Sequence, residues 1–276
     1  MLPENVIAIL VPVGVLAAMA IICAIVLTVA DKFFGVKEDE KFLAIRDCLP
    51  GANCGACGYS GCDGYAKALA EGKTASTNLC VPGGDKCSQE IATILGVEAA
   101  DVVEKVAYVA CNGNCAATER RYIYDGVKSC RVANLSYSGD KLCSYACLGY
   151  GDCVRVCPQD AIIIEDGVAR IDPRKCIGCG MCARECPNGI IHLIEDTERV
   201  VVECSNHDKG VAVRKSCKNG CIACGKCEKT CPEGAIKVID NLATIDYDKC
   251  TGCGNCAAVC PVHCIHEGNF VCGAHF

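Results

Sequence analysis

Aromatic residues are scarce in this 276-residue sequence, which has no tryptophan and only 5 phenylalanines, so a conventional aromatic-rich core is excluded. A phosphate loop and a dinucleotide fingerprint are also absent, because Gly58, Gly61 and Gly64 lie among cysteines and do not follow a predicted strand. No basic run accompanies the formal net charge of -6, which argues against a nucleic-acid partner. The 5 histidines show no paired ligand spacing.

Cysteine is present in excess, with 30 residues. Small modules with little apolar core need a metal or a covalent link to stay folded, so these cysteines are metal ligands or disulfides. The cellular compartment decides between the two, because reducing compartments disfavour structural disulfides.

The amino-terminal region indicates that compartment. Val6 to Ala30 runs 25 residues without a charge, roughly 37 Å as a helix, which predicts one transmembrane helix within residues 1–31. A secretory signal is the alternative, but Met1 to Val6 carries no Lys or Arg. Positive charges follow the apolar run at Lys32, Lys37, Lys41 and Arg46. We therefore expect a single-pass protein of the cell (inner) membrane with its large domain in the cytoplasm.

A cysteine pattern occurs twice, at a constant offset of 74 residues. The first copy comprises Cys130, Cys143, Cys147, Cys153, Cys157, Cys176, Cys179, Cys182 and Cys186. The second comprises Cys204, Cys217, Cys221, Cys227, Cys231, Cys250, Cys253, Cys256 and Cys260. Proline follows Cys157, Cys186, Cys231 and Cys260, which is typical of paired 4Fe-4S clusters.

The spacing predicts the ligands of individual clusters. In two-cluster ferredoxins, three cysteines of one run hold a cluster together with the Cys-Pro cysteine of the other run. This rule predicts three sites: Cys176, Cys179 and Cys182 with Cys157; Cys250, Cys253 and Cys256 with Cys231; and Cys221, Cys224 and Cys227 with Cys260. Tyr150 stands in the first repeat where the second has Cys224, so we expect a fourth site on Cys143, Cys147, Cys153 and Cys186.

Further cysteines lie before the repeats. Cys54, Cys57, Cys62 and Cys80 have the spacing Cys-x2-Cys-x4-Cys-x17-Cys and are expected to hold a fifth cluster. Cys111 and Cys115, with Cys130 and either Cys204 or Cys217, are candidate ligands of a sixth. We interpret Cys48, Cys87, Cys264 and Cys272 as free thiols or small core residues. Zinc is the rival metal, but zinc sites combine two separated cysteine pairs.

The expected fold is α+β: a transmembrane helix, a small helical 4Fe-4S module and two tandem dicluster ferredoxin-like modules. Their boundaries are 1–31 for the anchor, 32–47 for a linker, 48–86 for the amino-terminal module, 87–129 for a connecting segment, and 130–203 and 204–276 for the repeats. Helices are expected at Asp63–Glu71 and from Ser88 to Val106, and a strand at Val106–Ala110. Alternating residues around Asp166-Gly167 and Asp240-Asn241 predict one β-hairpin in each repeat.

The order of these modules resembles the B subunit of the Rnf complex over essentially the whole chain. The resemblance rests on the apolar helix, Leu49-Pro50 with the Cys54–Cys80 module, Gly83-Gly84, Cys111-Asn112-Gly113-Asn114-Cys115 and the ferredoxin repeats. It implies a subunit of a membrane-bound ferredoxin:NAD⁺ oxidoreductase that couples electron transfer to export of Na⁺ or H⁺. It also implies soluble ferredoxin as electron donor, with flavins and NAD on other membrane and flavin subunits.

Two other interpretations stay open at this point. One is a membrane-anchored polyferredoxin that serves another redox system without ion pumping. The other is a zinc-binding structural protein, which visible absorbance and metal analysis would distinguish.

Overall fold

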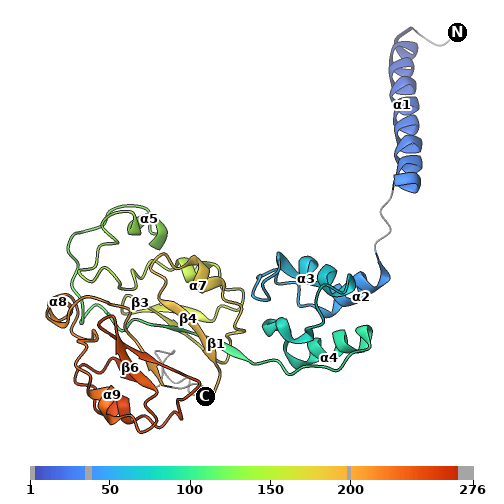
Figure 1. The fold of residues 1–276 in the computed structure, drawn as a ribbon. Helices are drawn as coiled ribbons and strands as arrows, with labels where there is room; N and C mark the ends of the chain where they lie inside the picture. Colours follow the sequence, from blue (N-terminus) through green and yellow to red (C-terminus); the bar gives the residue numbers. More distant parts are fainter. Residues whose placement is uncertain (1–3, 35–38, 198–199, 267–276) are drawn as a thin grey trace. The chain divides into compact units, whose positions relative to one another are not determined.

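The computed structural model describes residues 4–34, 39–197 and 200–266. The chain divides into two compact units, Met1–Leu43 and Ala44–Phe276 (Figure 1). The second unit combines short helices with four small antiparallel sheets, so the fold is mixed α/β. Cys272 lies outside the described residues.

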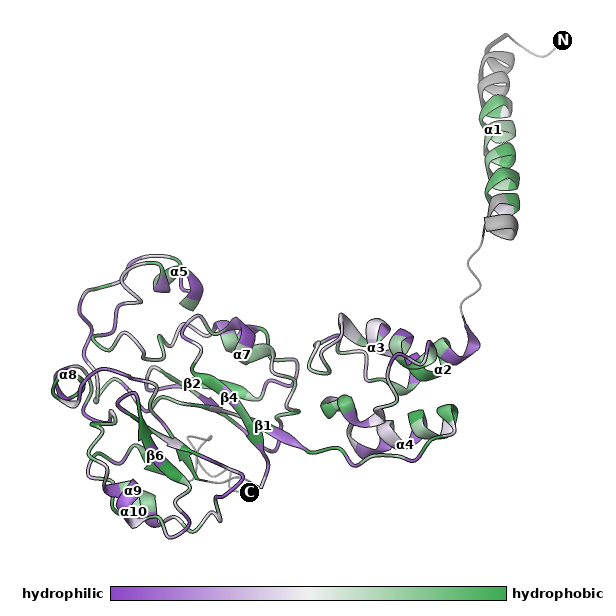
Figure 2. Cartoon of the chain, in the orientation of Figure 1, coloured by the Kyte–Doolittle hydropathy of each residue, from purple (hydrophilic) through white to green (hydrophobic). Residues whose placement is uncertain are grey.

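The first unit is dominated by helix α1, Glu4–Phe34. Its described side chains are almost all apolar and exposed, among them Leu16 and Leu27, and Figure 2 shows this hydrophobic character along the helix. Within the part of the chain that the structure describes, no helix is long and apolar enough to cross a membrane. The anchor over residues 1–31 therefore stays a prediction from the sequence.

A helical module opens the second unit. Its elements are the part of α2 (Glu40–Cys48) from Ala44 onward, α3 (Gly61–Ala70), η1 (Thr77–Leu79), η2 (Val81–Gly83) and α4 (Gly84–Leu95). Tyr65, Leu69 and Ile91 form its buried centre. The helix expected from Ser88 to Val106 is wrong beyond Leu95, because Gly96 adopts a left-handed conformation with φ 70° that ends the helix.

Each ferredoxin-like repeat contains the predicted hairpin. In the first repeat β2 (Ile162–Glu165) pairs with β3 (Val168–Ile171), and in the second β6 (Ile236–Ile239) pairs with β7 (Leu242–Ile245). Both turn residues of each hairpin have positive φ, as two-residue turns of this type require. The hairpin predictions are confirmed.

Two further sheets join segments that are distant in sequence. Strand β1 (Lys105–Val109) matches the predicted strand and pairs with β4 (Ile191–Glu195). Strand β5 (Val201–Val202) pairs in the same antiparallel sense with β8 (Ile265–His266). The remaining helices are short: α5 (Cys130–Asn134), α6 (Asp152–Arg155), α7 (Met181–Glu185), α8 (Gly210–Ser216), α9 (Lys226–Thr230) and α10 (Asn255–Ala258). Cysteines make up a large part of the buried core in both repeats.

Candidate iron–sulfur sites

Within the described part of the chain, four small cavities each have four cysteines in their walls. The four sets are Cys130, Cys147, Cys153 and Cys186; Cys231, Cys250, Cys253 and Cys256; Cys111, Cys143, Cys204 and Cys217; and Cys157, Cys176, Cys179 and Cys182. A repeated arrangement of four thiols around a small cavity suits a bulky inorganic cofactor bound by four thiolates.

Two of these cavities contain the groups that the ferredoxin spacing predicts, around Cys157 and Cys231. Each of these two cysteines precedes a hairpin whose first residues fold back over it. Ala161 N donates to Cys157 Sγ at 3.4 Å, and Ala235 N donates to Cys231 Sγ at 3.3 Å. The equal geometry shows that both repeats build this site in the same way.

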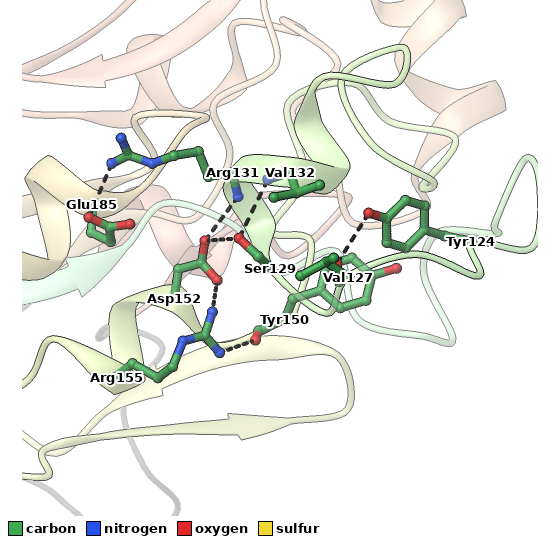
Figure 3. Close-up of polar contacts among 9 residues, drawn as sticks. All are labelled: Tyr124, Val127, Ser129, Arg131, Val132, Tyr150, Asp152, Arg155 and Glu185. Carbon is green, nitrogen blue, oxygen red and sulfur yellow. Dashed lines mark hydrogen bonds and ion pairs between the residues drawn. The ribbon is translucent and has the colours of Figure 1, made fainter.

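The cavity at Cys153 and Cys186 is completed by Cys130, which begins helix α5. Figure 3 shows what holds that helix in place. Asp152, buried beside Cys153, accepts from the Ser129 hydroxyl at 2.8 Å and from Arg131 N at 2.9 Å. Arg131 also pairs with Glu185 at 3.1 Å. The residues that flank Cys130 are thus tied to those that flank Cys153 and Cys186.

The spacing predicts that Cys143 lies with Cys153 and Cys186. The structure contradicts this prediction, because Cys130 takes that place. Cys143 instead lies at the third cavity, where Asn206 Nδ2 donates to its Sγ at 3.3 Å. Burial raises the pKa of Cys153, and the thiolate charges of Cys147, Cys130 and Cys186 raise it further. The physical reason for this difference is that Asp152 binds the residues on both sides of Cys130. Cys130 is thereby held beside Cys153, at the position predicted for Cys143.

The third cavity gathers Cys143 with three cysteines that the ferredoxin runs leave unassigned, Cys111, Cys204 and Cys217. Burial is the main cause that raises the pKa of Cys204 to about 12 and of Cys217 to about 11, and the Cys111 thiolate contributes to both. Cys115, the other candidate ligand from the connecting segment, is exposed and takes no part in the cavity.

Of the predicted group Cys221, Cys224, Cys227 and Cys260, three members lie in one buried core cluster and Cys224 is exposed. Burial raises the pKa of Cys227 to about 11, and the thiolates of the other three raise it further. A fifth thiol, Cys264, is buried with its Sγ 3.6 Å from Cys260 Sγ. Its hydrogen bonds lower the pKa of Cys260 to about 5 and of Cys221 to about 6.

The amino-terminal module groups Cys57 with Cys54 and Cys80, whose thiolate charges raise its pKa in addition to burial. Asn53 Oδ1 accepts from Cys62 N at 2.9 Å, which fixes the loop that carries these cysteines. A buried neighbour, Cys87, donates to Cys80 and lowers its pKa to about 7.

These sites fit iron–sulfur clusters on their own chemistry. Backbone N–H groups point at thiol sulfurs, for example Ala169 N at Cys147 Sγ (3.4 Å) and Ala107 N at Cys176 Sγ (3.5 Å), as the sulfurs of bound clusters require. Among the described residues, no three Cys, His, Asp or Glu side chains are gathered as they would be around a single metal ion.

Sequence spacing did not predict that Cys130 lies with Cys147, Cys153 and Cys186, or that Cys264 and Cys87 contact Cys260 and Cys80. For Cys130 a signal was present, since Ser129, Asp152 and Glu185 stand where the second repeat has Glu203, Lys226 and Val259. A polar network specific to one repeat indicates that the cysteine within it has its own role.

Three families match parts of the chain. Residues 49–82 match the family described as "Putative Fe-S cluster", residues 169–192 match "4Fe-4S binding domain", and residues 212–266 match "4Fe-4S dicluster domain". The predicted iron–sulfur domains are thereby confirmed.

Relatives match the chain over most of its length. The B subunit of the Na⁺-translocating ferredoxin:NAD⁺ oxidoreductase complex of Acetobacterium woodii is 47% identical over 94% of this chain and 78% of its own. The B subunit of the proton-translocating ferredoxin:NAD⁺ oxidoreductase complex of Clostridium ljungdahlii is 40% identical over 86% and 84%. The B subunit of an ion-translocating oxidoreductase complex of Methanosarcina acetivorans is 40% identical over 87% and 90%.

Proposed function

The chain belongs to the family of B subunits of the Rnf complex, the ion-translocating ferredoxin:NAD⁺ oxidoreductases, and we propose that it is the electron-transfer subunit of such a complex. In this role it accepts electrons from soluble reduced ferredoxin and passes them through 4Fe-4S clusters to membrane and flavin subunits. The complex couples this transfer to movement of Na⁺ or H⁺. The chain contributes tunnelling sites to that reaction, and no acid, base or nucleophile.

The observation that carries the proposal is the gathering of thiols in fours around small cavities within both repeats. When clusters are bound, they take up and release single electrons. The proposed ligands in the repeats are Cys157, Cys176, Cys179 and Cys182; Cys231, Cys250, Cys253 and Cys256; Cys221, Cys224, Cys227 and Cys260; and Cys130, Cys147, Cys153 and Cys186. Cys54, Cys57, Cys62 and Cys80 are the proposed ligands in the amino-terminal module.

We propose that electrons enter at the carboxy-terminal repeat and leave through the amino-terminal module, which is next to the predicted membrane helix in sequence. A contact within the second unit supports the last step. Arg184, which lies between the ligands Cys182 and Cys186, donates to the backbone carbonyl of Cys54, and the Cys54 thiolate adds to the burial that raises the pKa of Cys179.

The test is electron delivery by the assembled complex in membranes. Cys57→Ala should leave reduction of the repeats by ferredoxin intact and abolish NAD⁺ reduction, because the exit cluster loses a ligand. Rapid-mixing absorbance at the cluster bands measures the first step, and NADH formation measures the second. Cys48→Ala is the matched control, since Cys48 is not a proposed ligand and its Sγ bonds to the Ala44 carbonyl and to Glu90. Unchanged NAD⁺ reduction in Cys57→Ala would refute the exit role.

Membrane attachment is part of the proposal. The uncharged run from Val6 to Ala30 supports a single-pass anchor, with the cluster-bearing unit on the cytoplasmic side. Deletion of residues 1–31 should release the protein from washed membranes that lack the other subunits. Retention of the truncated chain would contradict an anchor at this position.

A polyferredoxin for a different redox enzyme is the second candidate, and co-purification separates the two. Gentle solubilisation should recover the chain with multi-span and flavin-carrying subunits. Recovery with a different oxidoreductase and without those subunits would favour the second candidate.

A further inference from the structure

The two repeats match more closely in space than their cysteine spacing indicates. Cys111 follows β1 by two residues and Cys204 follows β5 by two residues. Ala110 N, just before Cys111, donates to Ile190 O at 2.7 Å, and Glu203 N, just before Cys204, donates to Cys264 O at 2.8 Å. Because Ile190 and Cys264 are themselves 74 residues apart, Cys111 occupies in the first repeat the place that Cys204 occupies in the second.

Hydrogen bonds to the two sulfurs agree with this equivalence. Cys111 Sγ accepts from Cys147 N at 3.3 Å and from Gly113 N at 3.4 Å. Cys204 Sγ accepts from Cys221 N at 3.3 Å and from Asn206 N, two residues on, at 3.5 Å. Cys130 shares the 74-residue offset with Cys204 but not its structural position.

An insertion explains the mismatch. Cys143 follows Cys111 by 32 positions, whereas Cys217 follows Cys204 by 13, so the first repeat carries 19 additional residues. That longer segment contains α5 and Cys130, which completes the site where Tyr150 replaces Cys224. Each repeat is therefore left with one equivalent pair of cysteines that its own two clusters do not use: Cys111 with Cys143, and Cys204 with Cys217.

These two pairs line one small cavity together. Gly113 lies between the repeats there, and a Cβ on it would lie 3.4 Å from Cys111 Sγ and 3.8 Å from Cys217 Sγ. Backbone contacts fasten the two halves, with Asn112 N donating to Glu203 O at 3.0 Å and Ser205 Oγ donating to Ala110 O at 2.9 Å.

We propose that Cys111, Cys143, Cys204 and Cys217 hold a sixth 4Fe-4S cluster that joins the two repeats, each repeat contributing the same two ligand positions. The inference rests on the proposed electron-transfer function and names a site within it. The cluster takes one electron from a cluster of one repeat and gives one electron to a cluster of the other.

The surroundings suit an anionic cofactor. Lys141 is buried, and its ammonium group donates to Gly113 O and Gly167 O at 2.8 Å each, which places a positive charge beside the loop that carries Cys111 and Gly113. Asn206, 2% exposed, crosses from the second repeat to donate to Cys143. A buried cation and converging N–H donors stabilise negative charge on thiolate-bound iron.

The location also suits a connecting role. Cys147 and Cys221 are proposed ligands of one cluster in each repeat, and their backbone N–H groups donate to Cys111 and Cys204. Two ligands of a cluster at this cavity, Cys111 and Cys204, would therefore each accept a hydrogen bond from the ligand loop of a neighbouring cluster. Such a cluster would connect the two clusters of the first repeat with the two of the second in one electron path.

Iron content of the full-length, cluster-loaded chain, purified without oxygen, tests the proposal. We expect about 24 irons per chain, at about four irons per cluster, and about 20 in Cys217→Ala. The double variant Cys143→Ala/Cys217→Ala should also retain about 20, because both cysteines serve one cluster, whereas Cys130→Ala/Cys217→Ala should retain about 16. Cys115→Ala is the matched control and should keep the wild-type iron content.

A wild-type content of about 20 irons, or a further loss of four irons between Cys217→Ala and Cys143→Ala/Cys217→Ala, would overturn the proposal. Neither measurement needs ferredoxin or partner subunits. If five clusters are found and ferredoxin still reduces them, the sixth site fails while the electron-transfer function stands.

A second variant keeps the proposal testable if the cysteine variants do not fold. Asn206→Leu removes the side-chain N–H···S bond to Cys143 and leaves every cysteine in place. We expect full iron content and a lower midpoint potential for one cluster in an electron paramagnetic resonance titration. Unchanged potentials for all clusters would contradict a cluster at Cys143.

Discussion

Single residues distinguish otherwise equivalent clusters of the two repeats. Cys264 and Ile190 occupy matching positions, are equally buried at 1% exposure, and lie beside Cys260 and Cys186 respectively. Only the thiol can donate to cluster ligands, and a donor stabilises the more negative, reduced state of a cluster. We therefore expect the cluster bound by Cys260 to have a higher reduction potential than the cluster bound by Cys186.

Cys264→Ile should lower the reduction potential of the cluster bound by Cys260. A hydrogen bond to a charged group contributes about 1.5–3 kcal/mol, and if about 1 kcal/mol of it distinguishes the two redox states, the shift is on the order of 40 mV for one electron. A potentiometric titration followed by electron paramagnetic resonance measures it. Cys264→Ser keeps a donor and should shift less, while an equal shift in both variants would attribute the effect to packing.

At the scale of elements, local patterns are predictable and long-range ones are not. The hairpins follow from their turn residues and alternating strands, and the ligand loops from Cys-x2-Cys spacing, since each is decided within a few residues. The pairing of β1 with β4 and the arrival of Cys130 beside Cys153 depend on segments that only the folded chain brings together. Gly96 shows the converse: one left-handed residue ends a helix that the apolar pattern would continue.

Helix α5 supplies a testable case of such tertiary control. Asp152→Ala removes the acceptor that holds Ser129 and Arg131, the residues on either side of Cys130. Hydrogen bonds to a charged acceptor contribute about 1.5–3 kcal/mol each, so α5 should detach without them and one cluster should be lost, with about four irons. Asp125→Ala, at an exposed position of the same segment, is the control. Full iron retention in Asp152→Ala would show that Cys130 is held by other contacts.

For the whole molecule, cluster binding and folding are coupled, because cysteines form much of the core of both repeats. Removal of iron leaves cavities and buried thiols where the clusters would provide cross-links. We expect the iron-free chain to lose cooperative unfolding in the second unit, measured by far-ultraviolet circular dichroism during a thermal scan. An iron-free chain that melts as sharply as the loaded one would show that the protein core is sufficient.

The same coupling sets a pH dependence. Burial raises the pKa of Cys182 and Cys204 to about 12 and of Cys217 and Cys227 to about 11, so these four ligands are neutral thiols at pH 7 when their sites are empty. Ligation needs thiolates, so cluster binding releases protons and falling pH favours the empty state. As the pH falls from 8 to 6, iron retention against a chelator should therefore decrease, by about tenfold per pH unit for each proton released.

Free iron titrated in parallel corrects for the chelator's own pH dependence. Equal retention at pH 6 and pH 8 would mean that the ligands are already ionised in the empty protein, contrary to their burial.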